Sequence, residues 1–161
     1  MGSQQNKDSF YAYVAGFLDG DGCIAIRFEK SKTCRLGFRA RVRISFTQHK
    51  QKREVLDYLC KTIGSGVVSE YQHNNMAEYT IYDQVIIEQL LNGLEPYLIV
   101  KADHLSFAKK LIVLKRTGYS SDSLKEMHNL FKEIRSLNNY PKTILLDPVT
   151  TDNKGTRYSG T

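Results

Sequence analysis

The spacing of hydrophobic residues divides the chain into segments with helical and with strand periodicity. Residues 8–21 have apolar side chains at helical spacing and predict a helix, which Asp8 or Ser9 would cap. Residues 23–30 and 38–46 alternate between apolar and polar side chains, which predicts two strands joined by a polar turn. Because successive side chains of a strand point to opposite faces, the second strand has one apolar face and one face of arginines.

The later part of the chain continues with the same two kinds of pattern. The expected elements are a helix over 50–63, a hairpin with arms 67–73 and 78–82 joined by a turn at 74–75, a helix capped by Asp83 that ends before Gly93, a helix over 101–116, and a helix from Ser121 or Ser123 to Leu137. Hairpins imply an antiparallel sheet with helices on its apolar face, so the predicted fold class is α+β. Residues 8–140 would form one domain, with flexible or peripheral termini at 1–7 and 141–161.

Composition limits the possible classes of protein. The chain has 161 residues, 41% of them hydrophobic, which is enough for one core. Its net charge of +6 is compatible with an anionic partner without requiring one. Cys23, Cys34 and Cys60 lack the spacing of a metal site or a disulfide framework, so we expect reduced thiols. No apolar run approaches the roughly 20 residues of a membrane span. The N-terminus lacks a secretory signal, which predicts an intracellular protein, organellar or microbial, that is not secreted.

The first predicted helix ends in a sequence rich in glycine and aspartate. Gly16 and Gly20 are four residues apart and leave one face of the helix bare, so a second helix can approach it closely. An alternative is a buried helix whose small residues pack on its own sheet. The segment Tyr13–Gly22 (YVAGFLDGDG) resembles the motif of the LAGLIDADG homing endonucleases, in the group with one motif per chain. The resemblance extends to the order of elements over 8–137, to Thr47-Gln48, and to Pro96-Tyr97-Leu98 followed by Lys101.

The resemblance implies a fold, a partner and a reaction. The family's core is αββαββα, with a saddle-shaped antiparallel sheet that faces DNA and helices on the other side. Gly16 and Gly20 would form the dimer interface, because a chain with one motif needs a second copy of itself. The implied activity is that of a site-specific DNA endonuclease, a phosphodiester hydrolase. A homodimer would bind a long pseudo-palindromic site in double-stranded DNA and hydrolyse both strands, leaving 3′ overhangs. Neither a small-molecule substrate nor a membrane is implied.

By the same resemblance, the active site lies at the end of this helix. Asp21 would bind Mg²⁺ with its carboxylate and Gly20 with its backbone carbonyl, and Mn²⁺ or Ca²⁺ could replace Mg²⁺ in binding. Gln48 would order a nucleophilic water. Lys52 and Lys101 would offset the charge that develops on the phosphate in the transition state.

Two assignments in this site stay open at the level of the sequence. Asp19 competes with Asp21 for the metal, although its place inside the helix end favours a structural or capping role. Lys52 occupies a position where the family has an arginine, and the neighbouring basic residues Lys50 and Arg53 are alternatives to it.

The arginine face of the second strand is the predicted surface for DNA. Arg39, Arg41 and Arg43 are spaced two apart with no acidic neighbour in the strand, and their mutual repulsion favours an anionic partner. A two-stranded ribbon can enter the major groove, where arginine binds guanine bidentately. The predicted DNA-binding residues are Arg27, Glu29, Ser31, Arg35, Arg39, Arg41, Arg43 and Ser45 in the first hairpin, and Ser69, Tyr71, His73, Glu78, Thr80 and Tyr82 in the second.

Two other functions fit the same scaffold. An RNA maturase would use the fold to assist intron splicing without cutting, and a DNA-binding regulator would bind DNA without cutting it. Asp21, Gln48 and Lys101 favour cleavage, because a protein that only binds has no need of a metal carboxylate at the helix end.

Overall fold

The computed structural model describes residues 3–138, and its elements follow the predicted order. They are α1 (Gln4–Asp21), β1 (Gly22–Lys30), β2 (Phe38–His49), the short 3₁₀ turn η1 (Lys50–Lys52), α2 (Arg53–Ile63), β3 (Val67–Glu70), β4 (Met76–Ile81), α3 (Gln84–Leu94), α4 (Ala102–Arg116) and α5 (Ser121–Leu137). The predicted α+β class is confirmed. Residues 139–161, which include the whole of the predicted C-terminal segment 141–161, lie outside the described part.

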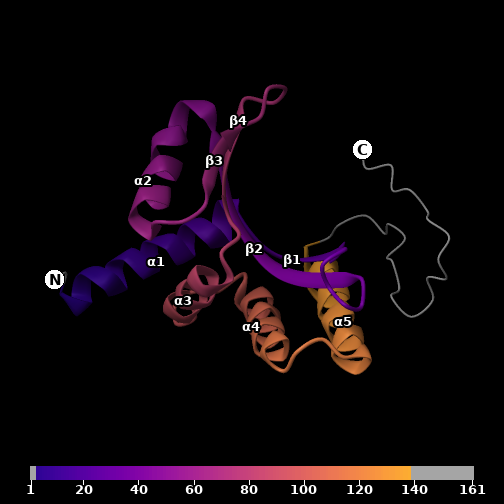
Figure 1. Ribbon diagram of the computed structural model, residues 1–161. Coiled ribbons are helices and arrows are strands. Elements are labelled where there is room, and N and C mark those ends of the chain that lie inside the picture. The colour runs from indigo at the N-terminus through magenta and orange to yellow at the C-terminus, as the bar shows by residue number, and fades with distance from the viewer. Residues whose placement is uncertain (1–2, 139–161) are drawn as a thin grey trace.

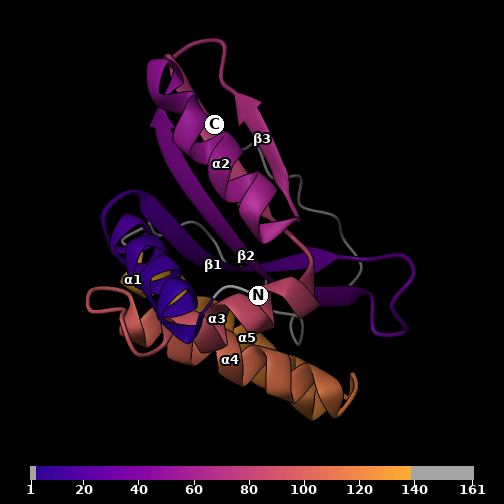
Figure 2. The same cartoon turned by 90° about the vertical axis from the view of Figure 1, so that its left-hand side faces the viewer.

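The strands form one antiparallel sheet in the order β1-β2-β4-β3. The sheet is curved, and the helices lie on its convex side, so the concave side stays open (Figure 1). Turned by 90°, the molecule presents α1 and α2 in front of the sheet (Figure 2). The apolar side chains of β2 at Ala40, Val42, Ile44 and Phe46 are buried beneath these helices, as the alternating pattern predicts. The arginines between them therefore face the concave side.

The core centres on a stack of aromatic rings between α1 and the sheet. Phe17 of α1 stacks on Phe46 of β2 with ring centroids 5.5 Å apart, and Phe46 stacks on Tyr79 of β4 at 5.8 Å. The hydroxyl of Tyr79 donates to the carbonyl of Ser65 at 2.5 Å, so this buried polar group is satisfied. Burial raises the pKa of Tyr79 and keeps its hydroxyl protonated as a donor. The packing holds the C-terminal end of α1 against the middle of the sheet.

Two predicted helix ends are wrong, for reasons that involve contacts rather than periodicity. α1 begins at Gln4 instead of Asp8, and the side chain of Asp8 accepts from Gln4 Nε2 inside the helix instead of capping it. α3 continues through Gly93 to Leu94. A Cβ at Gly93 would lie 2.3 Å from the ring of Tyr11 in α1, so this glycine permits close packing between two helices instead of ending one.

The free edge of β2 is covered by side chains from distant segments. β4 pairs with β2 only from Ile44 onward, so the earlier part of that edge has no neighbouring strand. Gln84 accepts from the Val42 N–H at 2.9 Å and donates to the Val42 carbonyl at 2.8 Å. The hydroxyl of Tyr119 lies 3.3 Å from the nitrogen of Ala40. These contacts replace the hydrogen bonds of a missing strand, which is how an edge avoids unpaired backbone groups.

The first arm of the second hairpin is shorter than predicted, and the second arm begins two residues earlier. β3 ends at Glu70, so Tyr71 and His73 lie in the connecting loop instead of the strand. The predicted turn is confirmed, since Asn75 has a positive φ of 55° and the Asn74 side chain accepts from the Met76 N–H. Within residues 3–138 the structure has no helix long and apolar enough to cross a membrane.

Candidate functional site

The two aspartates at the end of α1 have different surroundings. Asp19 accepts hydrogen bonds from the backbone N–H groups of Ile99, Val100 and Lys101, at 2.9, 3.2 and 3.0 Å. Burial raises the pKa of Asp19, but these bonds and the charge of Lys101 outweigh it and hold the pKa below its ordinary value. Asp19 therefore anchors the segment that leads into α4, which confirms the structural role expected for it.

Asp21, in contrast, is exposed at the last residue of α1. Its Oδ2 accepts from Gln48 Nε2 at 2.8 Å, so two predicted active-site residues from distant parts of the chain are in direct contact. Asp21 also lines a hollow of about 250 Å³ on the concave side of the sheet. The residues that line it are Asp21, Gly22, Cys23, Ala25, Arg27, Arg43, Ser45, Thr47 and Glu78. The carboxylate thus stands where the basic face of the sheet begins.

The predicted basic residues differ in how firmly they are held. Lys101 Nζ donates to the backbone carbonyl of Asp19 at 2.9 Å, which places its ammonium group at the end of α1. Arg53 is bound to Glu70 at 2.9 Å, and Lys50 lies 4.0 Å from the same carboxylate. Lys52 is exposed and makes no ion pair within the described residues. Of the three neighbouring cations, Lys52 alone remains free to reach a phosphate.

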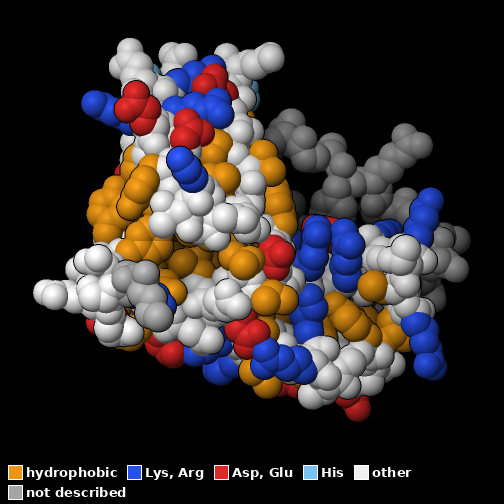
Figure 3. Space-filling view, turned by 60° about the vertical axis from the view of Figure 1, so that its left-hand side comes forward, with side chains coloured by type: hydrophobic (Ala, Val, Ile, Leu, Met, Phe, Trp, Pro, Cys, Tyr) orange, Lys and Arg blue, Asp and Glu red, His pale blue; other side chains and the backbone are white. Residues whose placement is uncertain are grey.

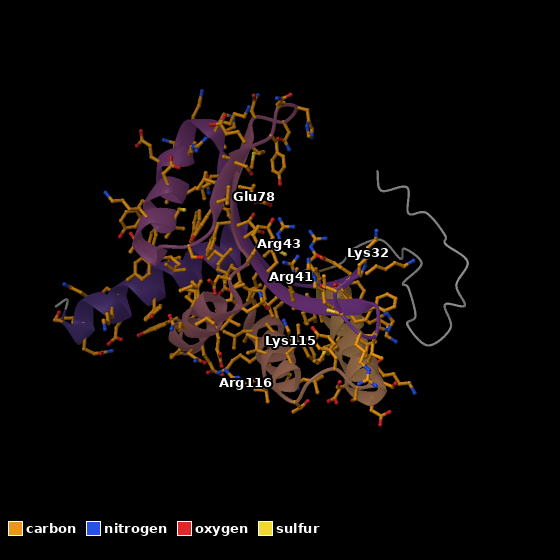
Figure 4. The ribbon with its side chains drawn as sticks, in the orientation of Figure 1. Lys32, Arg41, Arg43, Glu78, Lys115 and Arg116 are labelled. Carbon is orange, nitrogen blue, oxygen red and sulfur yellow. The ribbon has the colours of Figure 1, made fainter. Side chains whose placement is uncertain are left out.

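The arginine face of β2 also carries negative charge, which the sequence of this strand does not indicate. Glu29 of β1 lies 3.4 Å from Arg39 and 3.2 Å from Arg41, and Glu78 of β4 lies 2.6 Å from Arg43. The expectation of unrelieved repulsion was therefore wrong, because the acidic partners come from neighbouring strands. Figure 3 shows basic side chains gathered in the hollow with acidic ones beside them. In Figure 4, Arg41 and Arg43 project from β2 into the concave side.

The other predicted DNA-binding residues occupy three kinds of place. Ser45 and Thr80 are on the predicted face but are buried, and the Thr80 hydroxyl donates to Glu78. Arg27 is exposed and stands opposite Arg41. Ser31 and Arg35 lie in or beside the β1–β2 turn, and Tyr71 and His73 lie in the loop of the second hairpin. Ser69 lies within β3, and Tyr82 follows the end of β4 that is opposite this loop.

One basic residue close enough to the arginines to feel their charge was missed from the sequence. Lys115 of α4 is half-buried, and burial together with the charges of Arg41 and Arg39 lowers its pKa below the ordinary value. In the sequence it is one of two cations in the last turn of a helix, where basic residues are common. Only the packing of α4 against the sheet brings it near the arginines (Figure 4).

The bare face of α1 is open to solvent. A Cβ added at Gly16 or Gly20 would meet nothing within 4 Å among the described residues. Exposed apolar side chains surround this face: Tyr13 on the same helix, and Ile99 and Val100 in the segment that Asp19 anchors. Ile99 is 84% exposed, which is unfavourable for an isolated chain in water. The alternative, in which these glycines pack against their own sheet, is thereby excluded.

The residues that offer ligands to a metal are few in one chain. Within residues 3–138, no group of three or more His, Cys, Asp or Glu side chains could hold a metal ion. The Asp21 carboxylate and the adjacent Gly20 carbonyl fit a hard cation such as Mg²⁺, which is bound by one or two carboxylates together with waters and phosphates. A single chain thus offers one carboxylate and one carbonyl as possible ligands at the end of α1.

A curved antiparallel sheet with a basic concave face, next to a helix end with an exposed carboxylate, is the arrangement expected of a nuclease that binds its substrate on the sheet. The sequence profile of the LAGLIDADG endonuclease family matches residues 14–114. Because this match spans more than half of the chain, the protein belongs to the LAGLIDADG endonuclease family.

Similar proteins include endonucleases from green algae. The DNA endonuclease I-CreI of Chlamydomonas reinhardtii is 28% identical over 139 residues, which cover 86% of this chain and 83% of the relative. The DNA endonuclease I-CvuI of Chlorella vulgaris is 26% identical over 102 residues, 63% of each chain. A crystal structure of I-CvuI in complex with the I-CreI target superposes with a TM-score of 0.78 and 25% identity, covering 87% of this chain and 89% of that one.

Proposed function

We propose that this protein is a site-specific homing endonuclease that works as a homodimer on double-stranded DNA. The dimer would hydrolyse both strands of a long pseudo-palindromic site with the help of Mg²⁺, leaving 3′ overhangs. The observation that supports this most strongly is the position of Asp21, exposed at the end of α1, bound to Gln48 and facing the basic hollow. Family membership and the DNA-bound structure of I-CvuI support the same substrate.

The proposed chemistry assigns one task to each group around Asp21. Asp21 and the Gly20 carbonyl would hold the Mg²⁺ ion, which when bound neutralises the phosphate and lowers the pKa of a water. Gln48 donates through Nε2 to Asp21, which leaves its Oε1 as an acceptor that can orient the nucleophilic water. Lys52 and Lys101 would stabilise the charge that develops on the phosphate oxygens.

Dimerisation follows from the bare face of α1. Two copies of this helix can pack closely where Gly16 and Gly20 leave no side chain, and the exposed Tyr13, Ile99 and Val100 would be buried at the same contact. The packing would bring two copies of the adjacent helix ends together. Two carboxylates and two basic concave sheets would then face one DNA duplex.

Recognition of the sequence would come from the concave sheet. The arginines of β2 reach the major groove, while the exposed hairpin ends contact bases or phosphates farther from the cut. The cross-strand partners Glu29 and Glu78 are compatible with this role. Each carboxylate holds an arginine side chain in place before DNA binds, so less conformational entropy is lost on binding.

The test is a binding and cleavage assay on duplexes that the wild-type protein selects from a randomised library. We expect cleavage of both strands in Mg²⁺, none in EDTA, and retained binding with lost cleavage in Asp21→Asn. Asp122→Asn, which removes an exposed carboxylate at the start of α5, serves as the matched control and should cut normally. Tight binding without cutting in Mg²⁺ would instead identify a binding protein such as a maturase or a regulator.

Assembly is tested separately by sedimentation. Wild-type protein should sediment as a dimer, and Gly16→Leu should give monomers that still fold, because the added side chain meets only open space within its own chain. A wild-type protein that stays monomeric on its selected DNA would contradict the paired helices.

A further inference from the structure

Glu78 of β4 binds two side chains at the wall of the hollow. Its Oε1 accepts from Arg43 Nη2 at 2.6 Å and from the Thr80 hydroxyl at 3.0 Å. Burial raises the pKa of the nearby Tyr71, as does its interaction with the Glu78 carboxylate, so the phenol stays protonated. The arginine comes from β2 and the threonine from β4. One carboxylate thus links the two hairpins.

The Arg43–Glu78 pair is set apart by its burial. The two side chains are 18% and 16% exposed, less than either partner in any other ion pair of residues 3–138. Burying two charges costs desolvation energy, so such a pair adds little to stability by itself. Its effect is geometric, because it fixes the plane of the guanidinium group.

The fixed guanidinium still has donors without acceptors. Its hydrogen bond to Glu78 uses Nη2, and its buried Nε has no partner among the described residues. A guanidinium has five N–H groups in one plane, so several of them remain to bind an acceptor in the hollow. The terminal N–H groups of Arg43 that Glu78 does not use are therefore the donors available to a ligand in the hollow.

The combination of Arg43 and Glu78 favours a DNA base, and not a phosphate, as the group that binds Arg43. A phosphate would approach the Glu78 carboxylate as well as Arg43 and would be repelled by it. The major-groove edge of a G·C pair presents the two acceptors O6 and N7 on guanine and, beside them, the amino donor of cytosine. Arg43 and Glu78 present donors and an acceptor side by side, which is complementary to that edge.

We propose that Arg43 reads the guanine of a G·C base pair in each half-site, and that Glu78 positions Arg43 and provides the acceptor for the paired cytosine. This inference rests on the proposed function, since it requires double-stranded DNA on the concave sheet. Asp21 lines the same hollow as Arg43 and Glu78, so the G·C pair lies close to the cleaved bonds and not at the outer end of the half-site.

The experiment compares the base preferences of variants by selection from randomised duplexes. Arg43→Gln should lower the preference for G·C at one position near the cut by about tenfold, and raise that for A·T, because glutamine pairs with adenine. Glu78→Ala should weaken the same preference and leave the other positions unchanged. Glu88→Gln is the matched control: Glu88 pairs with Arg116 between α3 and α4, away from the concave face, and this variant should keep every preference.

Three results would overturn the inference. A uniform loss of affinity for all sequences in Arg43→Gln, with a salt dependence reduced by about one ion per subunit, would make Arg43 a phosphate contact. Lower thermal stability with unchanged base preferences in both variants would make the pair purely structural. The double variant Arg43→Glu with Glu78→Arg keeps an ion pair but moves the guanidinium group from β2 to β4. If this variant retained the preference for G·C at the same position, base reading by Arg43 would also be contradicted.

Failure of the inference differs from failure of the proposed function. If the wild-type protein selects and cuts a defined sequence while all variants select the same one, only the inference is wrong. If the wild-type protein selects no sequence, or binds without cutting, the proposed function is wrong.

Discussion

Replacing Asp19 by asparagine separates the structural aspartate from the metal-binding one proposed at Asp21. In the wild-type protein, Asp19 Oδ2 accepts from the N–H groups of Ile99 and Val100, and Oδ1 accepts from that of Lys101 at 3.0 Å. In Asp19→Asn, the amide oxygen can keep the first two bonds. The amide nitrogen then faces the N–H of Lys101, so that bond is lost and its donor is left unpaired.

The expected loss follows from this geometry. A hydrogen bond to a charged group contributes about 1.5–3 kcal/mol, and Asp19 lies close enough to the surface for water to replace part of it, so we expect destabilisation by about 2 kcal/mol. For a chain of this size, that lowers Tm by about 4–8 °C. Asp103→Asn is the matched control, because it removes a charge from the first turn of α4 without removing these bonds. It should reduce stability by about 0.3–1 kcal/mol.

The assay is denaturant unfolding at several pH values. The pKa of Asp19 in the folded protein lies below its ordinary value, so its contribution is complete above the unfolded pKa and is lost as the pH falls through the folded one. The difference between wild-type protein and Asp19→Asn should therefore be constant from pH 7 to about 5 and shrink below about pH 4. Asp21→Asn should change stability little. Wild-type stability in Asp19→Asn, together with normal cutting by Asp21→Asn, would show that the two roles are reversed.

Three further predictions concern single contacts. Lys52→Ala should slow cleavage about 10- to 100-fold at unchanged stability, and Lys52→Arg should retain activity; equal rates for the alanine variant would move the role to another residue. Gly93→Ala should destabilise the wild-type chain by about 1–2 kcal/mol through the clash with Tyr11, but stabilise a Tyr11→Ala background by about 0.5–1 kcal/mol, as a double-mutant cycle of unfolding measures. Gln84→Ala should cost about 1–3 kcal/mol in denaturant unfolding, because both backbone groups of Val42 lose their partner, and an unchanged midpoint would show that water replaces them.

Much of the fold could be predicted from local sequence. The alternation over residues 38–46 is strict enough to assign each side chain of β2 to a face, and the structure confirms it. The sequence also predicted the cap at Asp83, which accepts from the N–H groups of Val85 and Ile86. It likewise predicted the helix end at Gly64, which has a positive φ of 78°. Each feature depends on one residue and its neighbours. Local chemistry failed at Gly93, whose effect depends on the ring of Tyr11 in another helix.

For the candidate site as well, some features could be predicted from the sequence and others depended on the tertiary structure. The sequence by itself determined which residues have the right chemistry: a glycine-bearing helix, two aspartates at its end, and an arginine strand. Only the tertiary structure showed that Asp19 is bound to backbone N–H groups while Asp21 stays exposed, because the partners of Asp19 lie in residues 99–101, about eighty positions away. It also decided that Arg43 is paired with Glu78 and not left to repel its neighbours. The periodicity of a strand predicts which face of the sheet each side chain occupies. The charged groups that the side chain meets on that face belong to other strands, so a local pattern cannot predict them.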